Sequence, residues 1–290
     1  MVAGLDWINA ALGAVLGLLV GSFVNVVVHR LPRIMEREWA QECAEMAGQE
    51  PPATEPFNLM VPRSRCPHCG HAIRWYENIP VLSYLMLGGK CSACKAPIGL
   101  RYPVVELATA FFFGAAFLHF GMTPVALAWC GFAALLISLF LIDFDTQLLP
   151  DDLNYLLLWI GIGVALLGWG IPLTSSVYGA IFGYLALWSV VCLYYLLTGK
   201  IGMGNGDFKL LAALGAWFGV EYLFALILLS SLVGSVIGSL LLLVGRLANK
   251  DIPIAFGPFL AGAGLLAMLV GPQTLQQWAP FAFPLGPLLK

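Results

Sequence analysis

The feature that most constrains this chain is a series of long apolar runs, several of them 18 residues or more. Each is long enough to cross the ~30 Å hydrocarbon core of a membrane as an α-helix. Of the 290 residues, 60% are hydrophobic and 10% are charged, whereas a soluble domain carries about 25% charged residues. The mean hydropathy of +0.88 agrees. We therefore expect an all-α polytopic membrane protein.

Hydropathy predicts about eight membrane-spanning helices and one large polar segment. The predicted spans are residues 7–29, 102–120, 123–142, 153–170, 176–198, 207–220, 222–246 and 254–271. The polar segment lies between the first two spans. The sequence thus divides into a first transmembrane helix (1–29), a loop domain (30–101) and a membrane domain (102–290).

Basic residues determine the expected orientation, because cytoplasmic loops are enriched in Lys and Arg. Residues 30–101 hold nine of the 14 Lys and Arg residues, which predicts that this segment is cytoplasmic. If the spans alternate, both termini are external, and of the remaining basic residues only Lys290 falls outside. The other four are Lys200, Lys209, Arg246 and Lys250.

Two aspartates reach the same membrane face in this topology. Asp143 ends the third predicted span in "LIDFDTQLLPDD", and Asp207 begins the sixth in "GMGNGDFK". Ionisable groups at membrane depth are costly and mark functional sites. Two facing carboxylates share one proton, so one can activate a water while the other donates to a carbonyl, as in aspartic proteases. The alternative is that both aspartates are interfacial helix caps.

Neighbouring residues favour the active site over a plain helix start. Gly204 and Gly206 remove side chains next to Asp207, which permits close backbone approach and unusual dihedral angles. A helix start would not need two glycines. Asp151 follows Pro150 and precedes a span, so its simplest role is that of a helix N-cap.

Four cysteines in the polar segment have the spacing of a metal site. Cys66-x2-Cys69 and Cys91-x2-Cys94 are separated by 21 residues, a pattern typical of structural four-thiolate zinc sites. The segment is expected to be cytoplasmic, where disulfides are disfavoured. The spacing therefore predicts bound zinc that folds the loop, and free or redox-active thiols are the alternative.

Several of these motifs resemble a known family. "GNGD" is similar to the G-x-G-D signature of intramembrane aspartyl proteases, and the Asp143 segment with its following "LPD" resembles the partner motif of type 4 prepilin peptidases. Five further segments resemble the long bifunctional bacterial form of that family. They are "GSFVNVVVHRLP" (21–32), "PRSRCPHCG" (62–70), "ENIPVLSYLMLGGKCSACKAPI" (77–98), "RYPVVE" (101–106) and "FGPF" (256–259). The resemblance covers nearly the whole chain and implies that Asp143 and Asp207 are the catalytic pair, with Gly204, Gly206 and Pro150 in the supporting motifs.

The resemblance also implies a substrate and a second activity. The substrates would be type IV prepilins and type II secretion pseudopilins, whose basic leader is cut after a glycine at the cytoplasmic face of the bacterial inner membrane. The new N-terminal residue would then be methylated from S-adenosylmethionine; a peptidase without methyltransferase activity is the alternative. Zinc and S-adenosylmethionine are the implied cofactors. The expected partners are the substrates and the lipid bilayer, and not nucleic acid.

Candidates for the methyltransferase site are polar residues near the end of the first span and in the loop domain, which is taken as methyltransferase-associated. They are Asn25, Arg30, Glu77, Asn78, Gly89, Lys90 and Glu106. Structural roles as lipid anchors, caps or turn residues are the alternative for each. No G-x-G-x-x-G motif follows a strand, so a Rossmann-type methyltransferase fold is not expected. The acidic stretch 34–58 is expected to form a short helix followed by a linker.

Two other function classes stay open. A transporter or channel would use the same aspartates to bind a cation, and would be expected to show inverted repeats with broken helices, which the sequence does not display. A membrane scaffold would use the zinc loop to bind a partner, with the aspartates incidental. Cleavage of a prepilin-like peptide discriminates the three classes.

Overall fold

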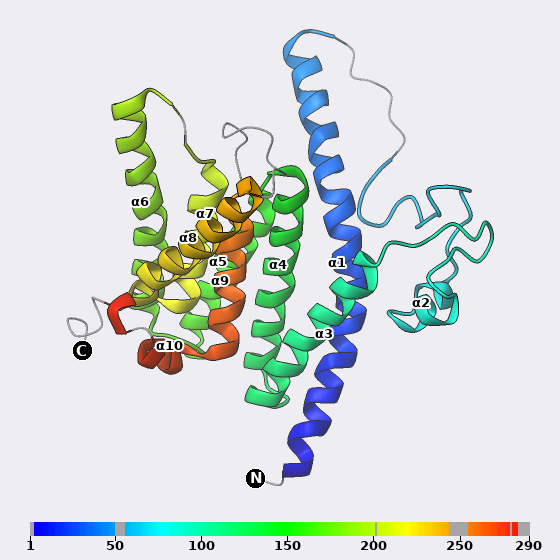
Figure 1. Cartoon of the computed structure of the whole chain (residues 1–290), viewed down its shortest axis with the longest axis horizontal. Helices are drawn as coiled ribbons and strands as arrows, with labels where there is room; N and C mark the ends of the chain where they lie inside the picture. The colour runs from blue at the N-terminus through cyan, green and yellow to red at the C-terminus, as the bar shows by residue number, and fades with distance from the viewer. Residues whose placement is uncertain (1–2, 50–55, 201, 244–254, 279, 284–290) are drawn as a thin grey trace. The chain divides into compact units, whose positions relative to one another are not determined.

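The computed structural model describes residues 3–49, 56–200, 202–243, 255–278 and 280–283. The described residues are predominantly helical, and their only β pairing consists of two isolated bridges. The chain divides into two compact units, residues 1–126 and 127–290, which are considered separately below (Figure 1). The all-α fold class is confirmed.

The helices have the following bounds. The first unit contains α1 (Ala3–Met46), the short 3-10 helix η1 (Trp75–Asn78), α2 (Leu82–Met86) and α3 (Arg101–Phe120). α4 (Pro124–Thr146) begins just before the boundary and belongs mainly to the second unit. The rest of that unit contains α5 (Asp151–Leu166), α6 (Leu173–Thr198), α7 (Asn205–Phe218), α8 (Val220–Leu243), α9 (Gly257–Val270), α10 (Pro272–Trp278) and the 3-10 helix η2 (Pro280–Ala282).

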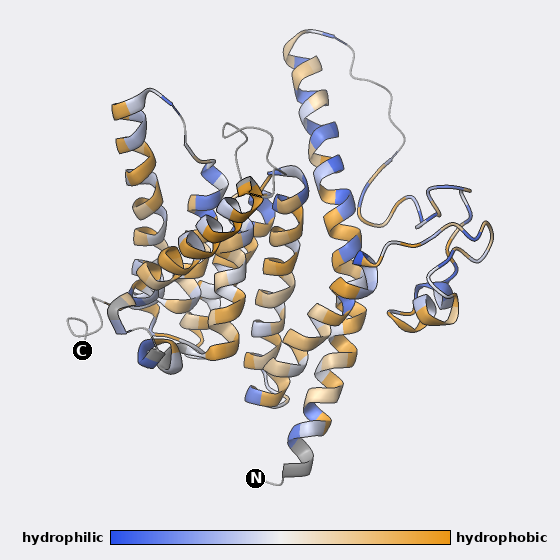
Figure 2. Ribbon diagram, viewed as in Figure 1, coloured by the Kyte–Doolittle hydropathy of each residue, from blue (hydrophilic) through white to orange (hydrophobic). Residues whose placement is uncertain are grey.

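Each of the eight predicted spans corresponds to a helix, but within the residues that the structure describes only five helices are long and apolar enough to cross a membrane. These five are α1, α3, α4, α6 and α8, and Figure 2 shows α6 and α8 as hydrophobic over most of their length. The other three, α5, α7 and α9, have 16, 14 and 14 residues. At about 1.5 Å per residue they are shorter than a membrane core. The protein is a multi-pass membrane protein, while the count of eight spans stays a prediction.

Three of the basic residues used to orient the chain, Arg246, Lys250 and Lys290, lie outside the described residues. The same holds for the predicted C-terminal end of the span 222–246 and for the first residue of the span 254–271.

The first helix is much longer than its predicted span. α1 has 44 residues and continues past the predicted end at residue 29, through Pro32, to Met46. The helix expected within 34–58 is therefore present, but it is continuous with the first helix instead of separate. Residues 34–46 are rich in Glu, Arg, Ala, Gln and Met, which are strong helix formers. Figure 2 shows the change from a hydrophobic to a hydrophilic helix along α1.

In the first unit, α1 and α3 pack through a row of small residues. Gly13, Gly17 and Gly21 occur every fourth residue along α1 and meet the backbone of α3. A Cβ on Gly17 would lie 2.6 Å from the Ala110 Cα, and one on Gly21 would lie 2.7 Å from the Glu106 Cα. Such small-xxx-small patterns let membrane helices approach closely where burial from water supplies no driving force.

In the second unit, α7 is the central helix, with 11 of its 14 residues buried. It packs against α5, α6, α8 and α9. Glycines on its neighbours allow the close approach: a Cβ on Gly183 of α6 would lie 2.7 Å from the Leu211 carbonyl oxygen. The Trp217 indole donates a hydrogen bond of 2.9 Å to the Leu157 carbonyl of α5. These contacts hold the middle and the C-terminal end of α7 against α6 and α5.

Candidate active site and metal centre

The second unit brings the two predicted aspartates into one buried site. Asp143 lies one turn before the end of α4 and is 5% exposed, and Asp207 lies in the first turn of α7 and is 7% exposed. They are 64 residues apart in sequence, yet the Asp207 carboxyl is within electrostatic range of Asp143. A carboxylate pair held in a largely buried position has the composition of an aspartic-protease site.

Each aspartate keeps one oxygen without a partner. Asp143 Oδ2 and Asp207 Oδ1 are buried and have no hydrogen-bond partner within the described part of the chain. Buried polar atoms are nearly always satisfied, so each exception requires an explanation. Two such oxygens on one carboxylate pair can accept hydrogen bonds from a water molecule or a substrate group that enters the site.

Gly257 closely confines the Asp143 carboxyl. Its backbone N–H donates to the Asp143 carboxyl, and a Cβ at this position would lie only 2.5 Å from Asp143 Oδ2. The same Cβ would lie 3.0 Å from Leu149 Cδ1. Gly257 belongs to the "FGPF" segment that the family resemblance singled out, but its contact with Asp143 could not be read from sequence.

The glycines beside Asp207 have different surroundings. A Cβ on Gly206 would lie 2.7 Å from Leu149 Cβ, so the close approach there is to the loop between α4 and α5. Gly204 has open space around it. Neither adopts a positive φ, so the unusual dihedral angles expected from the motif are not found. Pro150 is buried and is the N-cap residue of α5.

The sequence suggested that Asp151 is the N-cap of α5, but the structure shows that it is not. It lies inside the first turn of the helix, and its carboxylate accepts hydrogen bonds of 2.6 and 2.7 Å from Lys209 Nζ of α7. Lys209 also lies 5.3 Å from the centre of the Tyr155 ring. The lysine that follows the "GNGD" motif thus joins the first turns of α5 and α7.

Asn154 is a buried polar residue that sequence reasoning missed. It lies in α5, is fully buried, and both of its side-chain amide atoms have no partner among the described residues. Its only sequence signal was one amide side chain within an otherwise apolar run, and such residues are common.

In the first unit, the four predicted cysteines form a single cluster. The sulfur atoms of Cys66, Cys69, Cys91 and Cys94 all lie within 4.8 Å of one another, and Cys66 and Cys94 are 3.8 Å apart. Four sulfurs at about 2.3 Å from a tetrahedral ion are separated by about 3.8 Å, so the cluster fits zinc.

The two cysteine pairs are built alike. Cys66 N–H donates to the His71 carbonyl, and Cys91 N–H donates to the Ala96 carbonyl, both at 2.9 Å. Backbone N–H groups of Cys69 and His68 lower the pKa of Cys66 to about 7, which favours the thiolate that a metal requires. Between residues 56 and 100 only Cys66, Pro80 and Cys91 are buried, so this segment lacks an apolar core. A metal ion would supply the missing stabilisation.

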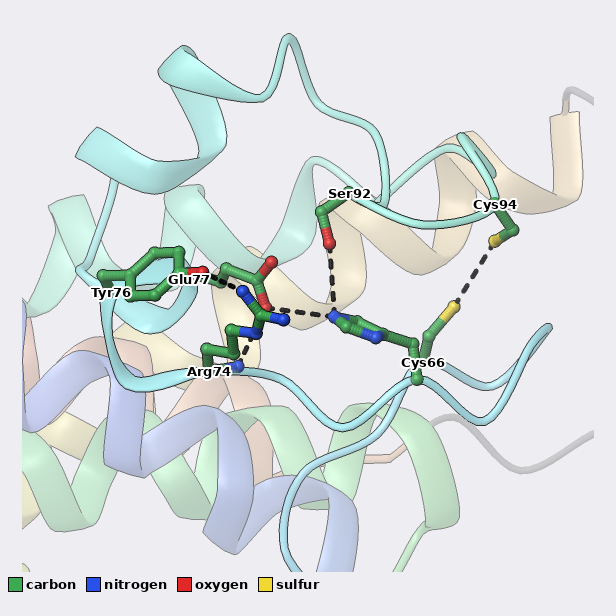
Figure 3. A network of polar contacts seen from close by, with 7 residues as sticks. Cys66, Arg74, Tyr76, Glu77, Ser92 and Cys94 are labelled. Carbon is green, nitrogen blue, oxygen red and sulfur yellow. Dashed lines mark hydrogen bonds and ion pairs between the residues drawn. The ribbon is translucent and has the colours of Figure 1, made fainter.

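A polar network lies beside the cysteines (Figure 3). The Glu77 carboxylate accepts a 2.8 Å hydrogen bond from the Arg74 backbone N–H and lies 3.3 Å from His71 Nε2. Ser92 Oγ is 3.3 Å from the same nitrogen. The hydrogen bonds from Arg74 and Ser92 lower the pKa of Glu77 to about 2. Glu77 was a predicted candidate, whereas its partners were not singled out.

These side chains border a cavity of about 530 Å³ in the first unit. Its lining includes Glu77, Arg74, Tyr76, Met86 and Leu87. The volume lies in the usual range of small-molecule sites, and the lining offers a carboxylate, a guanidinium group, a phenol ring and apolar side chains.

Three other candidates hold parts of the first unit together. Arg30 is buried and donates to the carbonyls of Asn58 and Pro62 at 2.9 and 2.7 Å. The buried Glu106 accepts from the Val81 backbone N–H at 2.8 Å. Both side chains thus bond to backbone groups of the loop segment. Asn25 likewise donates to a backbone carbonyl, that of Tyr102, at 3.2 Å.

The remaining candidates lie at turns of the loop. Asn78 is exposed and ends η1. Gly89 has a φ of 68°, and a Cβ there would lie 2.8 Å from the Tyr84 hydroxyl, so the position requires glycine. Lys90 is exposed and directly precedes Cys91.

Comparison with known proteins identifies relatives across both units. Residues 15–120 match the family described as the bacterial peptidase A24 N-terminal domain, and residues 130–239 match the type IV leader peptidase family. Three relatives are named prepilin leader peptidase/N-methyltransferase. The Pseudomonas aeruginosa protein is 54% identical over 92% of each chain. The Aeromonas hydrophila protein is 49% identical over 95% of each chain. The Burkholderia pseudomallei protein is 48% identical over 90% of this chain and 85% of its own. No solved structure matches the chain.

Proposed function

Because the chain belongs to the type IV leader peptidase family, an aspartic protease family, we propose that it cleaves the leader peptides of prepilins and methylates the new N-terminus. The observation that carries the peptidase assignment is the buried pair of Asp143 and Asp207, each with one unpartnered oxygen. The relatives supply the substrate class, since they are named for prepilin cleavage and N-methylation.

We assign Asp143 and Asp207 as the catalytic residues. The ionised carboxylate takes a proton from a water as the water oxygen attacks the scissile carbonyl carbon, and the protonated carboxyl donates to the carbonyl oxygen. Collapse of the tetrahedral adduct breaks the C–N bond and returns a proton to the leaving amine. Gly257 positions Asp143. Gly206, beside Asp207, packs against Leu149 of the α4–α5 loop, and Pro150 ends that loop as the N-cap residue of α5.

The loop domain, residues 30–101, carries the second activity in this proposal. When bound, S-adenosylmethionine would supply an electrophilic methyl group: the nitrogen of the N-terminal amine would form a bond to this carbon as the carbon–sulfur bond breaks, with release of S-adenosylhomocysteine and loss of a proton from the nitrogen. The cavity beside Glu77 suits this ligand because it combines charged groups with an aromatic ring and apolar side chains. Glu77 is therefore the strongest of the methyltransferase candidates, whereas the contacts of Asn25, Arg30 and Glu106 favour structural roles. A peptidase without methyl transfer is the alternative.

Zinc is the proposed metal. The supporting observations are the four sulfur atoms gathered within 4.8 Å and the shortage of buried side chains in the surrounding loop. All four positions of a tetrahedral ion would be filled by cysteine, so the role is structural and not catalytic.

We propose the inner membrane as the location, with the aspartate pair and the zinc loop on the cytoplasmic side. The support is the concentration of Lys and Arg in residues 30–101. A prepilin whose basic leader is cytoplasmic would meet the aspartates at that face.

One assay tests both activities. The purified full-length protein in detergent is incubated with a prepilin and with isotopically labelled S-adenosylmethionine, and the products are identified by mass spectrometry. The proposal expects a cut that releases the leader and a labelled methyl group on the new N-terminus. An intact prepilin would contradict the peptidase assignment and favour the transporter or scaffold classes, and cleavage without label would identify a peptidase alone.

A further inference from the structure

A groove in the second unit has no part in the chemistry described so far. It is a cavity of about 590 Å³ between α4, α8 and α9. Its walls are mainly apolar side chains from the three helices, with Gln147 as the exception, and its lining contains no charged residue. The largest of these side chains are Phe140 and Phe144 of α4, Ile237 and Leu241 of α8, and Phe259 of α9.

The groove has two lining residues next to the candidate active site. Phe144 directly follows Asp143 on α4, and Pro258 directly follows Gly257 on α9. Phe140 lies one helical turn before Phe144, and the two rings are stacked with 6.5 Å between their centres. The groove therefore lies beside the two residues that meet at the Asp143 carboxyl, although neither of them lines it.

The dimensions of the groove suit a helix. The lining of α8 extends from Leu229 to Leu241, which corresponds to about 18 Å, or about three helical turns. The volume is too small for a whole helix of that length but suits one apolar face of it, as in helix-in-groove recognition. Val233 and Leu266 line the groove and are 39% and 41% exposed, so it is open to the outside of the unit.

The charge of the lining decides which part of a substrate fits. Among the lining residues Gln147 is the one with a polar side chain, so a basic leader would lose its hydration there without a compensating partner. An uncharged apolar helix loses nothing comparable.

We propose that the α4–α8–α9 groove binds the apolar segment that follows the scissile bond of a prepilin. This assignment rests on the proposed peptidase function. It makes the groove a specificity site: the carboxylates cut the chain, and the groove selects substrates whose next segment is an apolar helix. A lipid chain is the competing occupant, and the test below separates the two.

Gly262 allows the groove to be filled without disturbing the fold. It lines the groove on α9, and a Cβ there meets nothing within 4 Å. Gly262→Leu therefore projects into open space. Gly163→Leu on α5 is the matched control, because its Cβ also meets nothing within 4 Å and Gly163 does not line the groove.

Two substrates are compared: a prepilin with its apolar segment, and a peptide that ends a few residues after the cleavage site. Gly262→Leu should raise the KM for the prepilin at least about tenfold, as expected when a well-fitting apolar site is obstructed, and leave cleavage of the short peptide unchanged. Gly163→Leu should match wild type on both. Equal cleavage of the prepilin by both variants would overturn the groove assignment, and a wild-type protein that cleaves neither substrate would instead refute the peptidase function.

A binding measurement checks the result without turnover. A photo-crosslinking amino acid is placed at Ile237, which lines the groove, or at Leu240, which lies on the same helix outside the lining. In the Asp143→Asn background, crosslinks from position 237 should map to the apolar segment of the prepilin, and position 240 should give few. Crosslinks at 237 to lipid alone would overturn the proposal.

Discussion

Replacement of Gly257 by alanine adds one methyl group and tests how tightly the site holds Asp143. The new Cβ would lie 2.5 Å from Asp143 Oδ2 and 3.0 Å from Leu149 Cδ1. An ordinary carbon–oxygen contact is about 3.3 Å, so the carboxylate must move by about 0.8 Å relative to α9. Leu149 leaves little room on the other side of the methyl group.

That displacement sets the expected size of the effect. A shift of about 1 Å in a catalytic group costs on the order of 10²-fold in rate, so we expect kcat/KM to fall by about that factor. The fold should tolerate the change, because alanine is a better helix former than glycine. Activity should therefore be lost without loss of thermal stability.

The assay is the rate of prepilin cleavage in detergent, with the unfolding midpoint measured in parallel. Gly163→Ala is the control, because its Cβ meets nothing within 4 Å and Gly163 does not line the groove. If kcat/KM for Gly257→Ala stays within about threefold of the control, the contact between Gly257 and Asp143 does not govern the geometry of the site and the reasoning is wrong.

Two further predictions concern the first unit. Gly17→Leu should lower the thermal unfolding midpoint by several degrees, since the α1–α3 contact leaves no room for a side chain, whereas Gly131→Leu, whose Cβ meets nothing within 4 Å, should leave it near wild type. Metal analysis of the purified protein should find about one zinc per chain. Cys66→Ser should lose the zinc, and its loop should become sensitive to protease. Cys43 lies outside the cluster, so Cys43→Ser should retain the zinc. A full complement of zinc in Cys66→Ser would refute the four-cysteine site.

The helices and the four-cysteine cluster could be predicted from the sequence because both depend on local pattern. Long apolar runs identify helices, and the spacing of Cys66, Cys69, Cys91 and Cys94 predicts one cluster, which the structure contains. Helix length was less well predicted, because hydropathy marks only where the apolar residues stop. α1 therefore extends well beyond its predicted end through residues that favour helix but not membrane.

What sequence reasoning could not provide were contacts between distant segments. Gly257 lies more than 100 residues from Asp143, and no local pattern connects them. The ion pair of Lys209 with Asp151 was missed for the same reason. A lysine after the motif and an aspartate at a helix start each have simple local explanations, and only the parallel packing of α5 and α7 brings them together.

The most direct test of the account is the cleavage rate of three single variants. Asp143→Asn and Asp207→Asn preserve side-chain shape while removing the proton-transfer groups, and Asp145→Asn alters an exposed carboxylate two residues away. We predict that the first two lose at least about 10³-fold in kcat with normal unfolding midpoints, and that Asp145→Asn cleaves at the wild-type rate. Cleavage by both Asp143→Asn and Asp207→Asn at rates near wild type would contradict the assignment of this pair as the catalytic residues.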